Sequence, residues 1–254
     1  MQPDPLFEMN GKVVLVTGAA GALGLAISQA LGERGATLCL TDLDRDKLES
    51  LASGLAGQTK PTTAHLDICN ETAVEETLKN VVDTHGRLDG LINAAGVFRT
   101  APITDITRDD FADSVSINLT APFLLTRAAA RVMSEAGGGR ILHLASVSSH
   151  VANPEYAAYA ASKAGLSQLV RVAARELAPE GITVNAIGQA MTETPLTDRL
   201  LSDPDRRAQV LSQIPMGRLC RPDDILATVI LLMAPGGAFI TGQTIFVDGG
   251  RTLV

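Results

Sequence analysis

Short apolar runs rich in β-branched residues recur along the whole chain and alternate with stretches of helical periodicity. Leu23, Ala26, Ile27, Ala30 and Leu31, for example, are spaced like one face of a helix. Strands separated by helix-length crossovers run parallel and are covered on both faces, which explains why the runs are continuously apolar. The pattern predicts seven strands, at Val13–Val16, Thr37–Thr41, Thr62–Leu66, Leu88–Asn93, Arg140–Leu144, Thr183–Ile187 and Thr244–Val247.

The order of these elements predicts a single α/β domain over residues 1–254: a Rossmann fold whose doubly wound, seven-stranded parallel sheet carries helices on both faces. We see no repeat, low-complexity tract or Pro/Ser-rich linker that would divide the sequence. Gly137–Gly139 is predicted to be a turn, and Ile225–Ala234 a buried helix. The least regular segment follows the sixth strand, and we expect a substrate lid around residues 189–215.

Composition narrows the class of partner. Of the 254 residues, 46% are hydrophobic and 19% are charged, as in a globular protein with a large core. A formal net charge of −7 without a run of Lys and Arg argues against nucleic acid and against membrane surfaces. Cys39, Cys69 and Cys220 have no disulfide or metal-ligand spacing, and the first residues lack a signal-peptide pattern. We expect a cytoplasmic protein with a small-molecule substrate and no metal.

A glycine-rich turn directly follows the first strand and opens the first helix. Backbone amides and the helix dipole can hold a pyrophosphate there, although isolated glycine patterns also occur in ordinary strand-to-helix turns. Asp42 follows by about 20 residues, where a carboxylate can bind ribose hydroxyls and repel a 2′-phosphate. Alternatively Asp42 is solvated or caps a helix, and Arg45 could attract that phosphate. The pattern predicts that NAD, rather than NADP, binds Gly18, Gly21, Ala22, Leu23, Gly24 and Asp42.

Tyr159 and Lys163 stand four residues apart in a helix-forming run, so their side chains share one face. For a phenol to act as a base near neutral pH, its pKa must fall by about 3 units, which requires about 4 kcal/mol of phenolate stabilisation. One ammonium at about 4 Å supplies roughly that much at an effective dielectric constant of 20. The alternative is a packed aromatic ring beside the aliphatic stem of a surface lysine.

Together these motifs resemble the short-chain dehydrogenase/reductase family over almost the whole chain, from the glycine turn to Val247-Asp248-Gly249-Gly250. Tyr159 and Lys163 match the family's Tyr-x-x-x-Lys pair, with Tyr159 as the acid/base. The resemblance implies that Ser146, thirteen residues before Tyr159, orients the substrate oxygen. It also implies that Asn118 holds a water that leads to Lys163, and that the protein is a homotetramer.

The resemblance adds residues to the cofactor site. Asp67 resembles the family's adenine-contacting Asp, and Thr194 resembles the threonine that holds the nicotinamide carboxamide. The segment after the fourth strand resembles the family's structural Asn-Ala-Gly element. The cofactor residues implied in this way are Asp67, Ile68, Asn93, Ala94, Ala95, Gly96, Tyr159, Lys163 and Thr194.

The chain departs from the family pattern at two positions. Ala22 replaces the middle glycine of the turn, and Gln189 replaces the proline of a Pro-Gly pair after the sixth strand. We expect Gln189 at the junction of nicotinamide and substrate, or else facing solvent on the lid. Ser148, His150, Tyr156 and Arg99 are further candidates for contact with the substrate. Alternatively, Ser148 shapes a turn, Tyr156 packs against its own helix and His150 is solvated.

The resemblance implies an NAD-dependent oxidoreductase that transfers a hydride between nicotinamide and a secondary alcohol or ketone. The first alternative is a 3-oxoacyl-thioester (acyl-carrier-protein) reductase that uses NADPH. The second is a nucleotide-responsive binding protein without turnover. Cofactor preference distinguishes the first alternative, and turnover of any carbonyl excludes the second.

Overall fold

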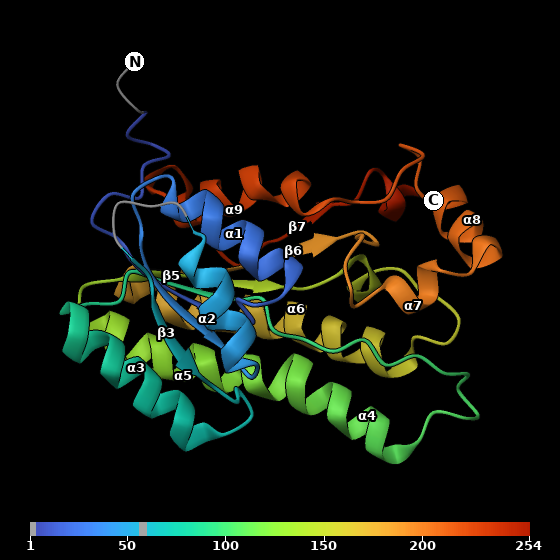
Figure 1. Cartoon of the computed structure of the whole chain (residues 1–254), viewed down its shortest axis with the longest axis horizontal. Helices are drawn as coiled ribbons and strands as arrows, with labels where there is room; N and C mark the ends of the chain where they lie inside the picture. Colours follow the sequence, from blue (N-terminus) through green and yellow to red (C-terminus); the bar gives the residue numbers. More distant parts are fainter. Residues whose placement is uncertain (1–3, 56–59) are drawn as a thin grey trace.

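The computed structural model describes residues 4–55 and 60–254 and contains the predicted parallel sheet (Figure 1). The strand order is β3-β2-β1-β4-β5-β6-β7. The chain leaves β1 on one side and returns to pair β4 on its other side, which creates the crevice where open α/β sheets bind ligands. The strands are β1 (Val13–Thr17), β2 (Thr37–Asp42), β3 (Thr62–His65), β4 (Gly90–Asn93), β5 (Gly139–Leu144), β6 (Ile182–Gln189) and β7 (Thr244–Val247).

Helices cover both faces of the sheet, as the predicted doubly wound fold requires. Figure 1 shows α1 and α9 on one side and α3 and α5 on the other. Along β1, the buried Val14 and Val16 pack into the first layer, whereas Val13 and Leu15 pack into the second. The helices are α1 (Ala22–Gly32), α2 (Arg45–Ser53), α3 (Glu71–His85), α4 (Arg108–Val115), α5 (Ala121–Glu135), α6 (Ala157–Leu177), α7 (Asp198–Leu201), α8 (Pro204–Ser212) and α9 (Leu226–Met233).

Some predicted boundaries differ from the structure because strand pairing decides them. β4 begins at Gly90 rather than Leu88, since its pairing with β1 begins there. Gly139 pairs with β6 and begins β5, so the glycine turn contains only Gly137 and Gly138, with φ of 84° and 127°. β3 ends one residue earlier than predicted. No helix in the two described ranges is long and apolar enough to cross a bilayer.

The segment after β6 is more regular than its sequence indicated. β6 itself continues past Ile187 to Gln189, because its last two residues pair with β7. The segment then forms the short helices α7 and α8. Asp203 caps α8 by accepting hydrogen bonds from the amides of Asp205 and Arg206, and Pro204 occupies the first turn. These caps give the expected lid region a defined shape.

Candidate active site

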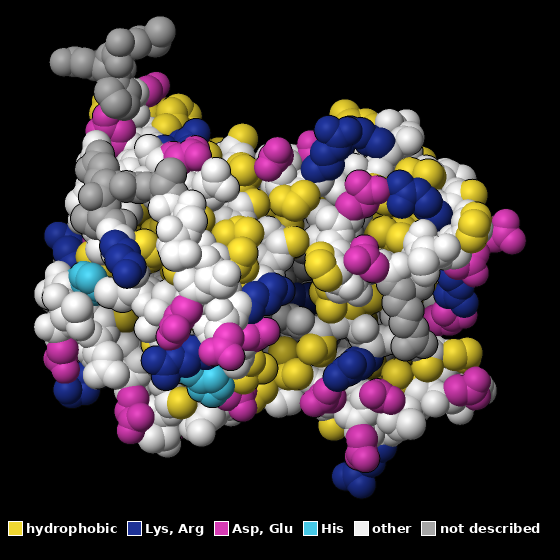
Figure 2. All heavy atoms as spheres, in the orientation of Figure 1, with side chains coloured by type: hydrophobic (Ala, Val, Ile, Leu, Met, Phe, Trp, Pro, Cys, Tyr) yellow, Lys and Arg dark blue, Asp and Glu magenta, His cyan; other side chains and the backbone are white. Residues whose placement is uncertain are grey.

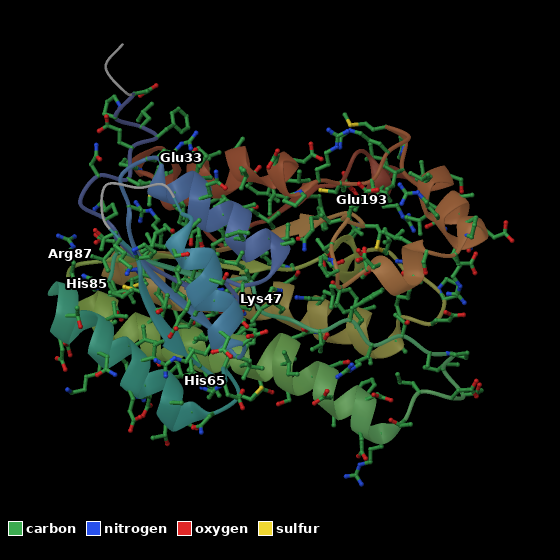
Figure 3. All side chains as sticks on the ribbon, in the orientation of Figure 1. Glu33, Lys47, His65, His85, Arg87 and Glu193 are labelled. Carbon is green, nitrogen blue, oxygen red and sulfur yellow. The ribbon has the colours of Figure 1, made fainter. Side chains whose placement is uncertain are left out.

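Two hollows meet at the carboxyl edge of the sheet, beside the reversal of strand order. One, here called the cleft, runs past the ends of β1, β2, β3 and β4. The other, here called the pocket, lies over the ends of β5 and β6. Leu23, Thr194 and Leu196 line both, so the two are continuous. Figure 2 shows this face hollowed near its middle, and in Figure 3 Lys47 extends from α2 toward the hollow.

Glycines shape the wall of the cleft where β1 turns into α1. Gly18 has φ of 67°, and a Cβ there would lie 2.5 Å from the amide nitrogen of Ala95. A Cβ on Gly24 would lie 2.2 Å from the Gly18 carbonyl oxygen. At Gly21 the same contact would be 3.2 Å, so this position is less constrained. Within the described residues no side chain caps α1, which leaves its first amides facing the cleft.

Asp42 ends β2 and ties it to the glycine turn. Its Oδ2 accepts a hydrogen bond from the Ala20 amide (2.9 Å), and its Oδ1 accepts one from the Asp44 amide (3.1 Å). The helix cap is Asp44, whose Oδ1 accepts a hydrogen bond from the Lys47 amide (3.0 Å). Arg45 is exposed and pairs with a glutamate one helical turn away on α2, outside the lining of the cleft. The carboxylates of Asp42 and Asp44 therefore face this part of the cleft.

The remaining predicted cofactor residues divide into two groups. Asp67 and Ile68 line the cleft after β3, and Asp67 Oδ1 accepts a hydrogen bond from the Cys69 amide (2.9 Å). Asn93 is buried behind the lining, where its Oδ1 accepts hydrogen bonds from Thr17 Oγ1 (2.7 Å) and the Ala95 amide (3.2 Å). Asn93 thus joins β1 to β4. The residues that follow it, Ala94, Ala95 and Gly96, line the cleft.

Tyr159 and Lys163 lie on α6, as the spacing predicted. The buried Lys163 Nζ lies 5.8 Å from the centroid of the Tyr159 ring and donates a hydrogen bond to the Leu144 carbonyl oxygen (2.7 Å) at the end of β5. Ser146, two residues further along, is buried, and its Oγ accepts a hydrogen bond from the Ser148 amide (3.1 Å). Tyr159 and Ser146 both line the pocket.

Asn118 lies close to this group on a single π-helical turn, Ser116–Thr120. Its Oδ1 accepts a hydrogen bond from the Val97 amide (3.0 Å), and its Nδ2 donates to the Val97 carbonyl oxygen (3.0 Å) and to Ser162 Oγ (3.2 Å). A Cβ on Gly96 would lie 3.1 Å from Asn118 Oδ1 and 3.6 Å from Lys163 Nζ. Gly96 therefore separates Asn118 from Lys163, and π-bulges of this kind are frequent at functional sites.

The electrostatics of the pair differ from the sequence-based expectation. Burial raises the pKa of Tyr159, and its hydrogen bond with Ser146 opposes that rise. Burial lowers the pKa of Lys163 to about 8. Removal from water disfavours both charged forms, which is why the lysine alone does not produce the expected low phenol pKa. A pKa raised above the ordinary phenol value leaves Tyr159 protonated at neutral pH.

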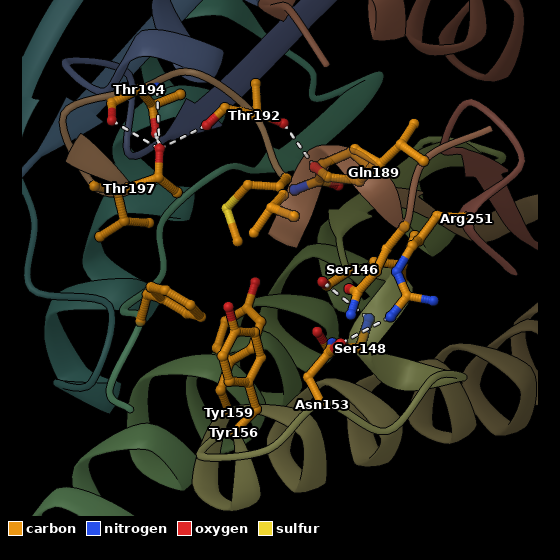
Figure 4. A pocket seen from close by; sticks show the side chains of 18 of the residues that line it. Ser146, Ser148, Asn153, Tyr156, Tyr159, Gln189, Thr192, Thr194, Thr197 and Arg251 are labelled. Atoms are coloured by element: carbon orange, nitrogen blue, oxygen red, sulfur yellow. Dashed lines mark hydrogen bonds between the residues drawn. The ribbon is translucent and has the colours of Figure 1, made fainter. Parts of the chain in front are cut away.

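The pocket closes over Ser146 and Tyr159 with side chains from separate segments (Figure 4). The segment that we expect to form a lid supplies Val210 from α8, and Leu196 and Thr197 before α7. Phe98 packs edge-on against Tyr159, with ring centroids 4.8 Å apart. The other lining residues are Leu23, Val147, Ser148, Asn153, Tyr156, Gln189, Ala190, Met191, Thr192, Thr194, Gln213, Ile214 and Arg251.

Comparisons with known proteins show the family to which this chain belongs. A family model described as enoyl-(acyl carrier protein) reductase matches residues 18–252. The 3-oxoacyl-[acyl-carrier-protein] reductase of Thermotoga maritima is 34% identical over 250 residues, covering 97% of this chain and all of that protein. D-threitol dehydrogenase of Mycolicibacterium smegmatis is 36% identical over 252 residues, covering 97% of this chain and 95% of that protein. The chain belongs to the short-chain dehydrogenase/reductase family.

A solved structure extends the comparison to three dimensions. The gluconate 5-dehydrogenase of Burkholderia cenocepacia, crystallised with NADP and tartrate, matches with a TM-score of 0.93 and 30% identity over 98% of each chain. This short-chain dehydrogenase/reductase is therefore an oxidoreductase that acts on alcohol or carbonyl groups with NAD(P).

The predicted substrate residues of this dehydrogenase/reductase do not all reach the pocket. Ser148, Tyr156 and Gln189 line it. His150 is exposed and lies outside the lining, with its ring centroid 5.7 Å from that of Phe246. Arg99 is also exposed, and its Nη2 pairs with an acidic side chain of α4 at 3.2 Å. The structure thus brings three of these five candidates to one site.

Sequence reasoning missed several residues of the pocket. Phe98, Asn153, Gln213 and Arg251 line it, yet none belongs to a motif of the family. A topological signal was present for Arg251, because it follows the last strand of a parallel sheet. The carboxyl ends of all such strands lie at one edge, so residues after β7 belong to the same edge as Ser146 and Gln189.

Proposed function

We propose that this protein is an NAD-dependent dehydrogenase of secondary alcohols that uses Ser146, Tyr159, Lys163 and Asn118. The observation that carries the proposal is the position of Tyr159. It lines the pocket beside Ser146, 5.8 Å from Lys163 Nζ, and Thr194 connects that pocket to a cleft with a glycine wall. A proton donor and acceptor therefore faces the place where substrate and nicotinamide would meet.

The cleft fits a dinucleotide. Its wall at Gly18 and Gly24 is bare of side chains, and a Cβ at either position would overlap backbone atoms. The uncapped amides at the start of α1 suit a pyrophosphate, and Asp42 and Asp67 suit ribose and adenine. Thr194 lies at the junction, where a carboxamide would be held. When bound, the nicotinamide supplies the hydride acceptor or donor.

Each of the four proposed catalytic residues has its own role in the transfer of the substrate proton. Ser146 orients the substrate oxygen, and Tyr159 exchanges a proton with it. Lys163 supports the phenolate, and Asn118 supports Lys163 through the space beside Gly96. In oxidation, R₂CHOH and NAD⁺ give R₂C=O, NADH and H⁺, with the hydroxyl proton passing to Tyr159. Reduction reverses both transfers.

The lining of the cleft supports NAD over NADP. Asp42 and Asp44 present carboxylates at the end of β2, where a 2′-phosphate would meet like charge. Arg45 pairs with Glu49 instead of entering the cleft, and Lys47 is the opposing cation. The gluconate dehydrogenase that binds NADP shows that this fold accepts the phosphate. Comparing kcat/KM for NAD⁺ and NADP⁺ tests the preference, and an NADP⁺ preference contradicts it.

The aspartate itself gives a sharper test. Asp42→Asn retains an acceptor for the Ala20 amide but removes the charge. The ratio of kcat/KM for NADP⁺ to that for NAD⁺ should rise by about tenfold, the scale of one exposed like-charge contact near a phosphate. Asp113→Asn, further along the same cleft, is the matched control and should leave the ratio unchanged.

The alternative with a specific observation behind it is a 3-oxoacyl-thioester reductase, because the Thermotoga protein of that name matches over its full length. Reduction of a 3-oxoacyl thioester with NADPH, at a higher kcat/KM than any alcohol oxidation, would favour it. The deciding experiment is an NAD⁺ and NADP⁺ reduction screen over secondary alcohols, run beside the thioester assay. No turnover in either arm would favour the nucleotide-binding alternative.

We propose a homotetramer in the cytoplasm. Three large apolar side chains on the outer helices, Phe111, Phe123 and Val172, are more than 40% exposed and are suited to subunit contacts. Light scattering after size exclusion measures the assembly, and a monomer would contradict the proposal.

A further inference from the structure

Arg251 differs from the rest of the pocket lining in its charge. Among the described lining residues, Arg251 is the charged side chain in a wall of apolar and neutral polar groups. Its Nη2 donates a hydrogen bond to Asn153 Oδ1 (2.8 Å), and its Nη1 donates to the main-chain oxygen of Val254 (3.3 Å). The Asn153 acceptor is a neutral amide, and the Val254 oxygen belongs to the last residue of the sequence. The rest of the planar donor fork is available to a ligand.

The position of Arg251 is fixed by the turn after β7. Asp248 accepts hydrogen bonds from the Gly250 amide (3.0 Å), the Thr252 amide (2.8 Å) and Thr252 Oγ1 (2.8 Å). Gly249 and Gly250 have φ of 60° and 89°, a conformation that L side chains rarely adopt. The tight turn directs the chain back over the edge of the sheet. In Figure 4, Arg251 and Asn153 face each other on the side of the pocket that holds Ser148.

The charge of Arg251 acts inside the pocket. Burial raises the pKa of Tyr156 to about 12, the neighbouring Tyr159 adds to that rise, and Arg206 and Arg251 oppose it. Tyr156 also lines the pocket. Arg251 is half-buried and lines the same pocket as Tyr156, so a substrate bound there would lie near its guanidinium.

A second polar group in the same wall lacks a partner. The Oε1 atom of Gln189 is buried and has no hydrogen-bond partner in the described structure. Gln189 lies at the end of β6 and lines the pocket with Arg251. A buried amide oxygen without a partner is costly, and a hydroxyl donor from a ligand would satisfy it.

We propose that Arg251 binds the carboxylate of the substrate, which is a short hydroxy acid in the oxidised direction and the matching oxo acid in the reduced direction. The planar guanidinium suits a carboxylate better than a single ammonium does. A further hydroxyl of the substrate donates to Gln189, and the reacting CH–OH faces Ser146 and Tyr159. The carboxylate is unchanged by the reaction. This inference rests on the proposed dehydrogenase function and narrows its substrate class.

The test compares acids with neutral alcohols of the same carbon skeleton. Four- to six-carbon aldonates are assayed against the corresponding alditols, and a simple secondary alcohol from the oxidation screen is the uncharged reference. In Arg251→Gln, the ratio of aldonate to alditol kcat/KM should fall by about 10- to 100-fold, the scale of a lost charge-assisted pair. The kcat/KM of the uncharged reference should fall much less than that of the aldonate. Arg251→Lys should recover part of the ratio, because it restores charge without the fork.

Arg171→Gln is the matched control. It makes the same chemical change on α6, where Arg171 is exposed and outside the pocket. It should leave the ratio unchanged. If the wild type oxidises neutral alcohols but Arg251→Gln leaves the acid preference intact, the inference is overturned while the proposed function stands. If the wild type oxidises no alcohol and reduces no ketone, the proposed function itself fails.

A binding measurement covers the case in which Arg251→Gln is inactive. Glutarate, a dicarboxylate that cannot be oxidised here, is titrated calorimetrically into the NADH-loaded wild type and variant. Loss of at least about tenfold in affinity supports the inference. Equal affinity overturns it. Tighter binding of a sugar phosphate than of the corresponding aldonate would also overturn it, because that outcome assigns the anion site to phosphate.

Discussion

The cleft and the pocket share one edge of the sheet, but they are built from different parts of the chain. The cleft wall at Gly18 and Gly24 is backbone, placed by two consecutive elements of a βα unit. The pocket wall is side chains brought together from segments as far apart as Phe98 and Arg251. A backbone wall recognises what all dinucleotides have in common. A side-chain wall can differ from one protein to the next without disturbing the fold.

The polar side chains expected to meet a ligand also differ in the internal hydrogen bonds that they make. In the cleft, both oxygens of Asp42 accept backbone amides, so its carboxylate stabilises the turn before any ligand arrives. In the pocket, Gln189 Oε1 is buried without a partner, and the guanidinium of Arg251 is only partly used. The Asp42 carboxylate is thus held by internal hydrogen bonds, whereas Gln189 and Arg251, like the uncapped amides of α1, keep bonding capacity for a ligand.

The largest effect on turnover is expected at Tyr159, which lies where the cleft and the pocket meet. Tyr159→Phe should reduce turnover by at least about 10²-fold, because it removes the proton donor and acceptor, while NADH affinity stays close to that of the wild type. Tyr156→Phe is the matched control: Tyr156 lines the same pocket, and burial raises its pKa to about 12. Its loss should cost much less. Near-normal turnover in Tyr159→Phe would reject the mechanism.

The glycines in the backbone wall of the cleft should tolerate even a small substitution poorly. Gly24→Ala places a methyl 2.2 Å from the Gly18 carbonyl oxygen, and the turn must shift to accept it. NADH affinity, measured by fluorescence titration, should fall by about tenfold or more. Gly21→Ala meets the same oxygen at 3.2 Å and should have a smaller effect. Equal affinities in the two variants would show that the turn adapts, and the contrast with the pocket would weaken.

The pH dependence of the two directions follows from the raised pKa of Tyr159. Its protonated form is favoured at neutral pH, so ketone reduction should proceed there and decline as the phenol ionises. Alcohol oxidation needs the phenolate, so its kcat/KM should rise with pH by up to about tenfold per unit. The rise should flatten above pH 8, because Lys163, with a pKa of about 8, then loses the charge that supports the phenolate. An oxidation rate independent of pH between 6 and 8 would contradict this assignment.

The smallest effect is expected at the edge of the lid. Arg206 on α8 donates two hydrogen bonds to Glu155, at 2.8 and 3.2 Å, and so joins the expected lid to the loop before α6. Arg206→Gln should raise the substrate KM by no more than about threefold, because exposed ion pairs contribute about 0–1 kcal/mol. Lys79→Gln, which breaks an exposed pair on α3, is the control and should leave KM unchanged. A change in NADH affinity instead of KM would place the effect in the cleft.

Local sequence patterns were enough to predict the strands, the helix face of the catalytic pair and the glycine turn. The short runs predicted all seven strands. The central strands are mostly apolar because they are buried on both faces, whereas β3 at one edge of the sheet is exposed. The spacing of Tyr159 and Lys163 predicted their shared helix face, since a helix brings residues four apart together. The glycine turn predicted the wall of the cleft, because its sterics involve residues close in sequence.

Only the tertiary structure decided the strand ends, the environment of the pair and the membership of the pocket. β4 and β6 begin and end where their neighbours pair with them. Burial moves the pKa of Tyr159 upward, because solvent exclusion depends on the whole fold rather than on the lysine one turn away. Arg251 meets Asn153 across nearly a hundred residues of chain, and His150 stays outside the pocket although it follows Ser146 closely. Contacts between distant segments depend on how the layers pack, which no local pattern encodes.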